Sequence, residues 1–154
     1  MELDFSNHIF VATDFSDPSL AAIDAAHILA HQLGAKVTLF HTFDPEPLVP
    51  PGAIPNPAAY HDRIEQEMTD ACRARLGELR QEKLADLQDV DLLVSSGRSA
   101  ASDICDKAKE LNADLIIVAT HGRTGFSQLL IGSVAEKVVR HAHCPVLAVR
   151  VPKH

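Results

Sequence analysis

The sequence has no excess of positive charge and no long apolar run. Its 14 lysines and arginines face 21 aspartates and glutamates, giving a formal net charge of −7 at pH 7. Proteins that bind nucleic acids or anionic membranes nonspecifically present a basic face, so this charge balance argues against both. No apolar stretch approaches the roughly 18 residues needed to span a bilayer. The first residues, MELDFSNHIF, are acidic and lack the apolar core of a signal peptide, so we expect a cytoplasmic protein.

Cysteine is also scarce. The three cysteines, Cys72, Cys105 and Cys144, are scattered and odd in number, which is not the pattern of a disulfide framework. Cys144 follows His141 and His143 in the segment HAHCP, which could suggest a metal site. Such a site needs further ligands, and none is spaced nearby. A helix ending before a proline is the simpler interpretation, and we expect no metal held directly by side chains.

What the sequence does contain is an alternation of short apolar runs with longer amphipathic stretches. The runs cover residues 8–12, 36–40, 91–95, 115–119 and 145–151. Nearly continuous apolar strands are typical of a parallel sheet covered on both faces. Because strands and helices alternate along 154 residues, we predict one α/β domain over residues 1–154 with a doubly wound, five-stranded parallel sheet and right-handed crossovers.

Helix boundaries are marked by capping residues. Asp17 precedes Pro18, a pattern typical of an N-cap followed by proline at the first helical position. Ser99 is the predicted cap of a third helix. Ser133 and Glu136 form an S-x-x-E pattern, which predicts a capping box at the start of the fourth helix.

The second helix is predicted to be long and to follow a proline-rich segment. Residues 43–57 hold six of the nine prolines and have no usable period, so we expect neither helix nor central strand there. Loops of this length inside a compact domain are usually lids or mobile segments. The helix then presents one apolar face, formed by Tyr60, Ile64, Met68, Cys72, Leu76 and Leu79.

The most informative stretch is THGRTGFSQLLIGSVAEKVV, residues 120–139, which leaves the fourth strand through three glycines. Ligands of open α/β sheets bind outside the carboxyl ends of the strands, and a helix N-terminus there attracts anions. Gly132 removes a side chain where the helix begins, and Gly122 frees the backbone earlier in the loop. The P-loop and G-x-G-x-x-G motifs are absent, and GFSQL departs from a nucleophile elbow at Leu129. Spacing alone leaves phosphate binding and a plain loop equally open.

Asp14 is a second candidate, because it follows the first strand at the same edge of the sheet. A carboxylate there could accept a hydrogen bond from a ribose hydroxyl or hold a hydrated Mg²⁺. The alternative is that it caps the first helix, since aspartate and serine cluster at this point.

The combination of these features resembles the universal stress protein family over about residues 5 to 151. The resemblance rests on VATDFS at residues 11–16, on residues 114–149, and on five strands in the expected order. The nucleotide-binding branch of that family carries G-x-x-G, nine residues, then G-[ST]. Gly122, nine residues, Gly132 and Ser133 match it, whereas Ala119 replaces the first glycine. Ser99 stands where many members have proline.

The resemblance implies a Rossmann-like sheet of strand order 3-2-1-4-5 and an adenine nucleotide site. The implied site residues are Asp14, Thr42, Val118, Ala119, Gly122, Arg123, Gly132, Ser133 and Val134. In that scheme Asp14 lies near the ribose and phosphates, and Thr42 offers backbone atoms to adenine. Arg123 either adds charge at the γ-phosphate or points to solvent, and the methyl group of Ala119 either crowds the ribose or shifts it.

Three functions follow as hypotheses. The leading one is a cytoplasmic stress-response protein that binds ATP, with Mg²⁺ reached by Asp14 through water, as a signalling or conformational ligand with little or no hydrolysis. The second is a nucleotide-free dimeric interaction module, favoured by Ala119. The third is a slow ATP phosphohydrolase. The resemblance also implies a homodimer through residues 145–151, since an apolar sheet edge tends to pair unless it is covered.

Overall fold

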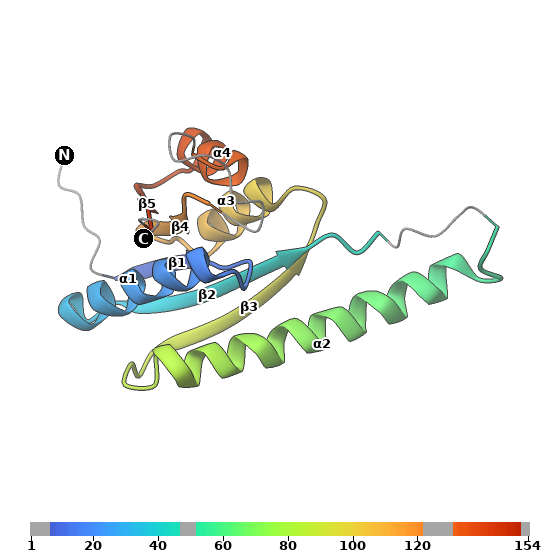
Figure 1. Cartoon of the computed structure of the whole chain (residues 1–154), viewed down its shortest axis with the longest axis horizontal. Coiled ribbons are helices and arrows are strands. Elements are labelled where there is room, and N and C mark those ends of the chain that lie inside the picture. The colour runs from blue at the N-terminus through green and yellow to red at the C-terminus, as the bar shows by residue number, and fades with distance from the viewer. Residues whose placement is uncertain (1–6, 47–51, 122–130, 152–154) are drawn as a thin grey trace.

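The computed structural model describes residues 7–46, 52–121 and 131–151. Within them, strands and helices alternate along the whole chain, as predicted (Figure 1). The strands are β1 (His8–Ala12), β2 (Lys36–Phe43), β3 (Val90–Ser96), β4 (Leu115–Ala119) and β5 (Val146–Val149). The helices are α1 (Asp17–Leu33), α2 (Pro57–Lys83), α3 (Ala100–Glu110) and α4 (Ser133–His141).

All strands of the sheet are parallel, in the order β3-β2-β1-β4-β5. The central strand β1 pairs with β2 on one side and β4 on the other, so that Val11 lies opposite both Leu39 and Ile117. The chain winds outward to β3 in one direction and to β5 in the other. The predicted doubly wound sheet and its 3-2-1-4-5 order are therefore confirmed, and the strand order reverses between β1 and β4.

Helices cover both faces of this sheet. Side chains alternate between the two faces along each strand, so an apolar strand places apolar side chains on both. Ile9, Val11 and Leu39 pack into a core beneath α1 and α2. Phe10 and Phe40, whose ring centroids are 5.0 Å apart, belong to the second core beneath α3 and α4. Figure 1 shows α3 and α4 together on one side of the sheet, with α1 and α2 on the other.

Three strands differ in length from the prediction, and for two of them the neighbours explain why. Strand β3 is one residue longer at each end than the predicted run 91–95. The apolar runs predicted β1 and β4 correctly. Strand β2 continues three residues further, to Phe43, because β3 runs beside it as far as Ser96. Strand β5 ends at Val149 rather than Val151, because its only partner, β4, ends at Ala119 opposite Val149.

The capping predictions for α1 and α3 are partly confirmed. Asp17 is the first residue of α1 and not its N-cap, which is Ser16. Gly34 ends α1 with φ 68°, the left-handed conformation that favours glycine. Ser99 caps α3, where its side chain accepts a hydrogen bond from the backbone N–H of Ser102.

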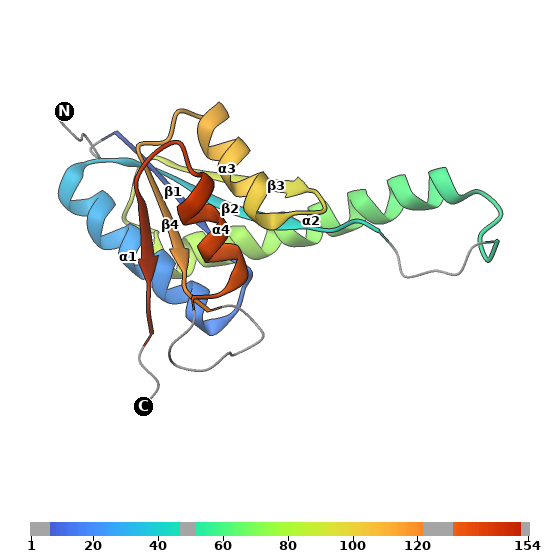
Figure 2. The same cartoon turned by 90° about the horizontal axis from the view of Figure 1, so that it is seen from above.

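Helix α2 extends well beyond β3 (Figures 1 and 2). Its 27 residues span about 40 Å at the rise of an α-helix, whereas the 7 residues of β3 span about 23 Å. Only Leu76 and Leu79 of the predicted apolar face are fully buried. Of the proline-rich segment, residues 44–46 and 52–56 form neither helix nor strand, as predicted, while Phe43 ends β2 and Pro57 begins α2. Residues 47–51 lie outside the described part.

No described helix is long and apolar enough to cross a membrane.

Candidate functional site

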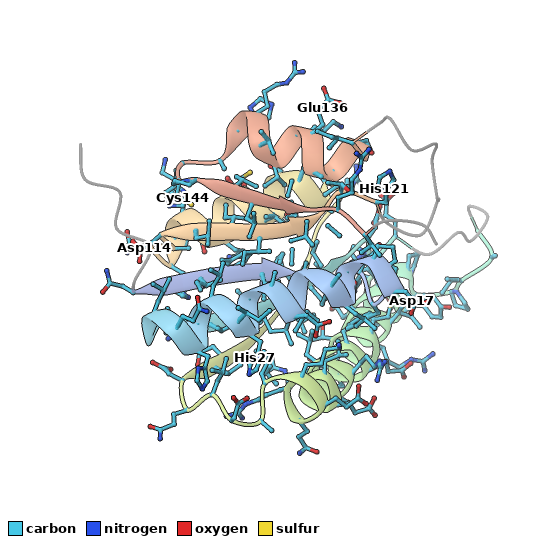
Figure 3. The ribbon with its side chains drawn as sticks, turned by 60° about the vertical axis from the view of Figure 1, so that its left-hand side comes forward. Asp17, His27, Asp114, His121, Glu136 and Cys144 are labelled. Atoms are coloured by element: carbon cyan, nitrogen blue, oxygen red, sulfur yellow. The ribbon has the colours of Figure 1, made fainter. Side chains whose placement is uncertain are left out.

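The candidate site lies at the carboxyl ends of β1, β2 and β4, next to the first residues of α1 and α4. Figure 3 shows Asp17 and His121 at this end of the sheet, with Asp114 and Cys144 at the opposite end. Because the strands are parallel, segments that follow three different strands meet here. The chain thus brings Asp14, Thr42 and Gly132 to the same edge.

The head of α4 is shaped by a close backbone contact. The Gly132 N–H donates to the Thr120 carbonyl oxygen at 2.5 Å. A Cβ atom on Gly132 would lie only 2.8 Å from that oxygen, closer than real Cβ atoms approach. Gly132 has φ −59°. The glycine is therefore needed for space and not for an unusual backbone angle.

The predicted capping box of α4 is wrong. Gly132 is the N-cap, and Ser133 is already the first helical residue. Glu136 pairs with Arg140 at 2.7 Å instead of reaching back to the cap. The contact between Gly132 and Thr120 starts the helix one residue earlier than the S-x-x-E pattern predicts. Among the residues that the structure describes, no side chain caps α4, and the N–H groups of its first turn carry the positive end of the helix dipole.

The turn after β1 is organised by Asp14. Its Oδ1 atom accepts hydrogen bonds from the backbone N–H of Ser16, at 3.0 Å, and from the Ser16 hydroxyl. Phe15, between them, has φ 66°, a left-handed conformation that is uncommon for a bulky residue. The N-cap of α1 is Ser16. Asp14 therefore holds the turn that precedes the helix, and the N-cap alternative for Asp14 is wrong.

This turn also interrupts the pairing of β1 with β2. If the parallel ladder continued, the Thr42 N–H would donate to the Thr13 carbonyl and the Thr42 carbonyl would accept from the Phe15 N–H. The Thr13 carbonyl instead contacts Nδ1 of His41 at 2.8 Å, and the Phe15 N–H donates to Thr13 Oγ1 at 3.0 Å. The last ladder bond is that of the Thr13 N–H to Phe40.

Thr42 therefore has a backbone edge that does not pair with β1. The Phe40 carbonyl faces β1, so the N–H and carbonyl of Thr42, two residues on, face the same side. On its other side β2 is held by β3, where the Gly97 N–H donates to the Phe43 carbonyl at 2.9 Å. An adjacent donor and acceptor on one exposed edge can pair with a planar group that offers the complementary acceptor and donor.

The predicted residues of β4, Val118 and Ala119, lie at its carboxyl end. Val118 is buried, and Ala119 is half-buried with its methyl group packed against the core beneath α1. His121 lies two residues after Ala119, with Nδ1 2.8 Å from Thr120 Oγ1 and a buried Nε2 that has no hydrogen-bond partner among the described residues. Ser133 and Val134 are exposed at the head of α4. Gly122 and Arg123 lie outside the described residues.

Sequence reasoning missed Asp103 and Gly97, which stand beside this edge. Thr42 Oγ1 donates to Asp103 Oδ2 at 2.6 Å. A Cβ atom on Gly97 would lie 2.6 Å from Asp103 Oδ1. A glycine directly after a strand was the only local signal, because Asp103 is 61 residues from Thr42 in the chain.

Metal-ligand clusters are not part of this site. Within the described ranges, no group of three or more histidine, cysteine or acidic side chains could hold a metal ion. His143 Nε2 lies 3.1 Å from the Ala113 carbonyl, so this side chain links the segment after α4 to the segment before β4. Burial raises the pKa values of the Cys105 and Cys144 thiols, which favours their protonated form.

Comparison with known proteins now decides the family. The profile of the universal stress protein family matches residues 6–150. The chain belongs to the universal stress protein family. A universal stress protein of Methanocaldococcus jannaschii is 33% identical over 94% of this chain and 82% of its own length. The structure of the universal stress protein UspA from Lactobacillus plantarum superposes with a TM-score of 0.72 at 26% identity, covering 96% of this chain and 99% of that one. A universal stress protein solved in complex with cAMP has a TM-score of 0.66 at 25% identity, covering 96% and 98%.

Proposed function

We propose that this universal stress protein belongs to the nucleotide-binding branch and binds ATP in the crevice between β1, β2, β4 and α4. The observation that carries the proposal is the start of α4, where Gly132 leaves no side chain over the backbone and no side chain of the described residues caps the helix. Uncapped N–H groups at a helix N-terminus form hydrogen bonds to phosphate oxygens, and the dipole favours their charge. Gly132, Ser133 and Val134 would hold the phosphates, with Gly122 and Arg123 completing the loop.

Adenine fits the backbone edge of Thr42. The base offers an acceptor, N1, beside a donor, the 6-amino group, and Thr42 offers an N–H beside a carbonyl. Guanine and hypoxanthine carry the reverse pattern, a donor at N1 and an acceptor at position 6, and would pair poorly with this edge. The relative solved with cAMP, which also carries adenine, supports an adenine nucleotide in this family.

Ala119 and Val118 would line the ribose. The methyl group of Ala119 packs partly against the core beneath α1. We infer that it shifts the sugar slightly and does not block it. Whether the methyl group shifts or blocks the ribose distinguishes ATP binding from the nucleotide-free interaction module. Ala119 is the only feature that favours that module.

Mg²⁺ would be held by the nucleotide phosphates and reached by Asp14 through water. Asp14 Oδ1 already accepts two hydrogen bonds from Ser16. A carboxylate held in this way is a weak base for activating water, so we expect ATP to be bound with little or no hydrolysis. ATP then acts as a signalling or conformational ligand.

The protein would act as a homodimer through β5. This strand lies at the edge of the sheet, and Leu147 on it is 38% exposed. The Pro145 and Val149 carbonyls face β4, so the backbone groups of the alternate residues, Val146 and Ala148, face outward. Pairing two copies along this edge would satisfy those groups.

The proposal is tested by incubating the purified protein with Mg-ATP, isolating the complex by rapid gel filtration and analysing the bound nucleotide. We expect intact ATP in near-stoichiometric amount with no multiple-turnover release of phosphate. Recovery of no nucleotide would favour the interaction module. Rapid production of ADP, lost in Asp14→Asn, would favour the phosphohydrolase.

A further inference from the structure

The end of β2 that would contact the base is a strand segment held on one edge only. His41, Thr42 and Phe43 pair with β3, while β1 has already turned away. The position of this segment therefore depends on what holds its side chains. On the α1 face, the His41 side chain is held by the Thr13 carbonyl, which its Nδ1 atom contacts, and by the Phe15 ring. The centroids of the His41 and Phe15 rings are 4.2 Å apart.

On the opposite face, Asp103 of α3 holds Thr42. Thr42 points to the α3 face because it follows Phe40 by two residues, and Phe40 lies in the core beneath α3 and α4. The hydrogen bond from Thr42 Oγ1 to Asp103 Oδ2 is short, at 2.6 Å, and partly buried. A carboxylate accepts but does not donate, so the threonine hydroxyl is the donor and its orientation is fixed.

Gly97 makes room for this contact. The Asp103 carboxylate lies where a side chain at Gly97 would begin, with Oδ1 2.6 Å from the expected Cβ position. Gly97 also donates its N–H to the Phe43 carbonyl, next to Thr42. The end of β2, the end of β3 and the first turn of α3 are thus joined around one carboxylate.

We propose that Asp103 is a positioning residue for base recognition, which sets the place of the Thr42 backbone edge through the Thr42 hydroxyl and so determines the preference for a 6-amino over a 6-oxo purine. The inference rests on the proposed adenine site. A hydrogen-bonded pair discriminates between donor and acceptor patterns only while its atoms are held in place, and a free strand end can move to accept either.

The test is the ratio of the dissociation constants for ITP and ATP, measured by calorimetry on the full chain. Thr42→Val and Asp103→Ala each break the contact, and Gly97→Ala displaces the carboxylate without changing either partner. We expect each to lower the ITP-to-ATP ratio by about threefold to tenfold, the range of one net hydrogen bond. Thr42→Ser keeps the donor and should keep the ratio.

Thr38→Val is the matched control. Thr38 lies on the same strand and face, and its hydroxyl is 2.8 Å from His8 Nε2 at the other end of the sheet. It should lower stability while leaving the ratio unchanged. The double variant of Thr42→Val and Asp103→Ala should be no worse than either single variant, because both remove one interaction.

Several results would overturn the proposal. Wild-type ratios in Thr42→Val and Asp103→Ala would do so, as would equal losses of ATP and ITP affinity in all variants, including Thr38→Val. If the wild type binds neither nucleotide, the proposed function fails and this inference fails with it. That outcome is distinct, since it appears before any variant is compared.

Discussion

The Nδ1 atom of His41 lies 2.8 Å from the carbonyl oxygen of Thr13, a position that a backbone N–H of β2 would occupy if the sheet continued. A side chain thus replaces a ladder bond where β1 leaves the sheet. The consequence is that, among the described residues, the last residues of β2 pair with a strand on one side only. This arrangement leaves a backbone edge at the end of the sheet, where we propose that the base binds.

Thr13→Val should destabilise the fold. Thr13 is buried, and its Oγ1 accepts from the Phe15 N–H and lies 2.8 Å from the Ser19 hydroxyl. Removing the hydroxyl leaves both groups without this partner, at a cost of about 1–3 kcal/mol in the free energy of unfolding. Urea denaturation measures it. An unchanged midpoint would show that this network does not support the turn.

The two helix-start serines should respond differently to alanine. Ser99→Ala removes a hydroxyl that accepts from the Ser102 N–H, and should cost about 0.5–2 kcal/mol of stability. Ser133→Ala removes a hydroxyl that caps nothing in α4, so its effect should be clearly smaller. Thermal unfolding of both variants compares them. Equal losses would restore the capping box that the sequence suggests.

Asp86 should make stability depend on acidic pH. Its Oδ1 lies 2.7 Å from His27 Nε2, and this hydrogen bond lowers the pKa of the carboxyl below 3.8. Since the folded pKa lies below the unfolded one, the contribution is complete above the unfolded pKa and is lost as pH falls through the folded value.

The measurement is the midpoint of urea denaturation for wild type and Asp86→Asn, taken at decreasing pH from pH 5 to below the ordinary pKa of an aspartate. We expect the difference between them to shrink below about pH 4, the ordinary value of an aspartate. Asp89→Asn, which neutralises another carboxylate in the same connection between α2 and β3, is the matched control. A constant difference at every pH would contradict the assignment.

Ala148→Pro should dissociate the proposed dimer. The Ala148 N–H faces away from β4, so proline removes an outward donor and spares the bonds to β4. Ala148→Ser keeps the N–H and serves as the control. Sedimentation should show monomers for the proline variant and dimers for wild type and control. A proline variant that stays dimeric would place the interface elsewhere.

The sequence predicted the sheet well because apolar runs and their alternation with helices are local signals. The runs at β1 and β4 matched the strands to the residue. It predicted the ends of β2 and β5 less well, since those depend on where β3 and β4 stop. The residue at which a strand ends depends on how far its neighbour runs.

The site shows the same division. Asp14 and Gly132 were predicted as site residues, and parallel strands bring them to one edge. The partnership of Thr42 with Asp103 was not predictable, because no periodic signal links residues so far apart in the chain. The capping box failed because the contact between Gly132 and Thr120, which joins two elements, decides where α4 begins.

The central claim is that the head of α4 holds the phosphates of ATP, and calorimetric titration with Mg-ATP of Gly132→Ala beside Gly77→Ala tests it most directly. A Cβ atom at Gly132 would meet the Thr120 carbonyl at 2.8 Å, whereas one at Gly77, inside α2, would meet nothing within 4 Å. Gly77→Ala should gain about 0.5–1 kcal/mol of stability and bind as wild type does. We predict binding in the micromolar range for wild type and Gly77→Ala, with a large loss in Gly132→Ala while it remains folded. Equal binding by all three proteins, or by none, would contradict the account.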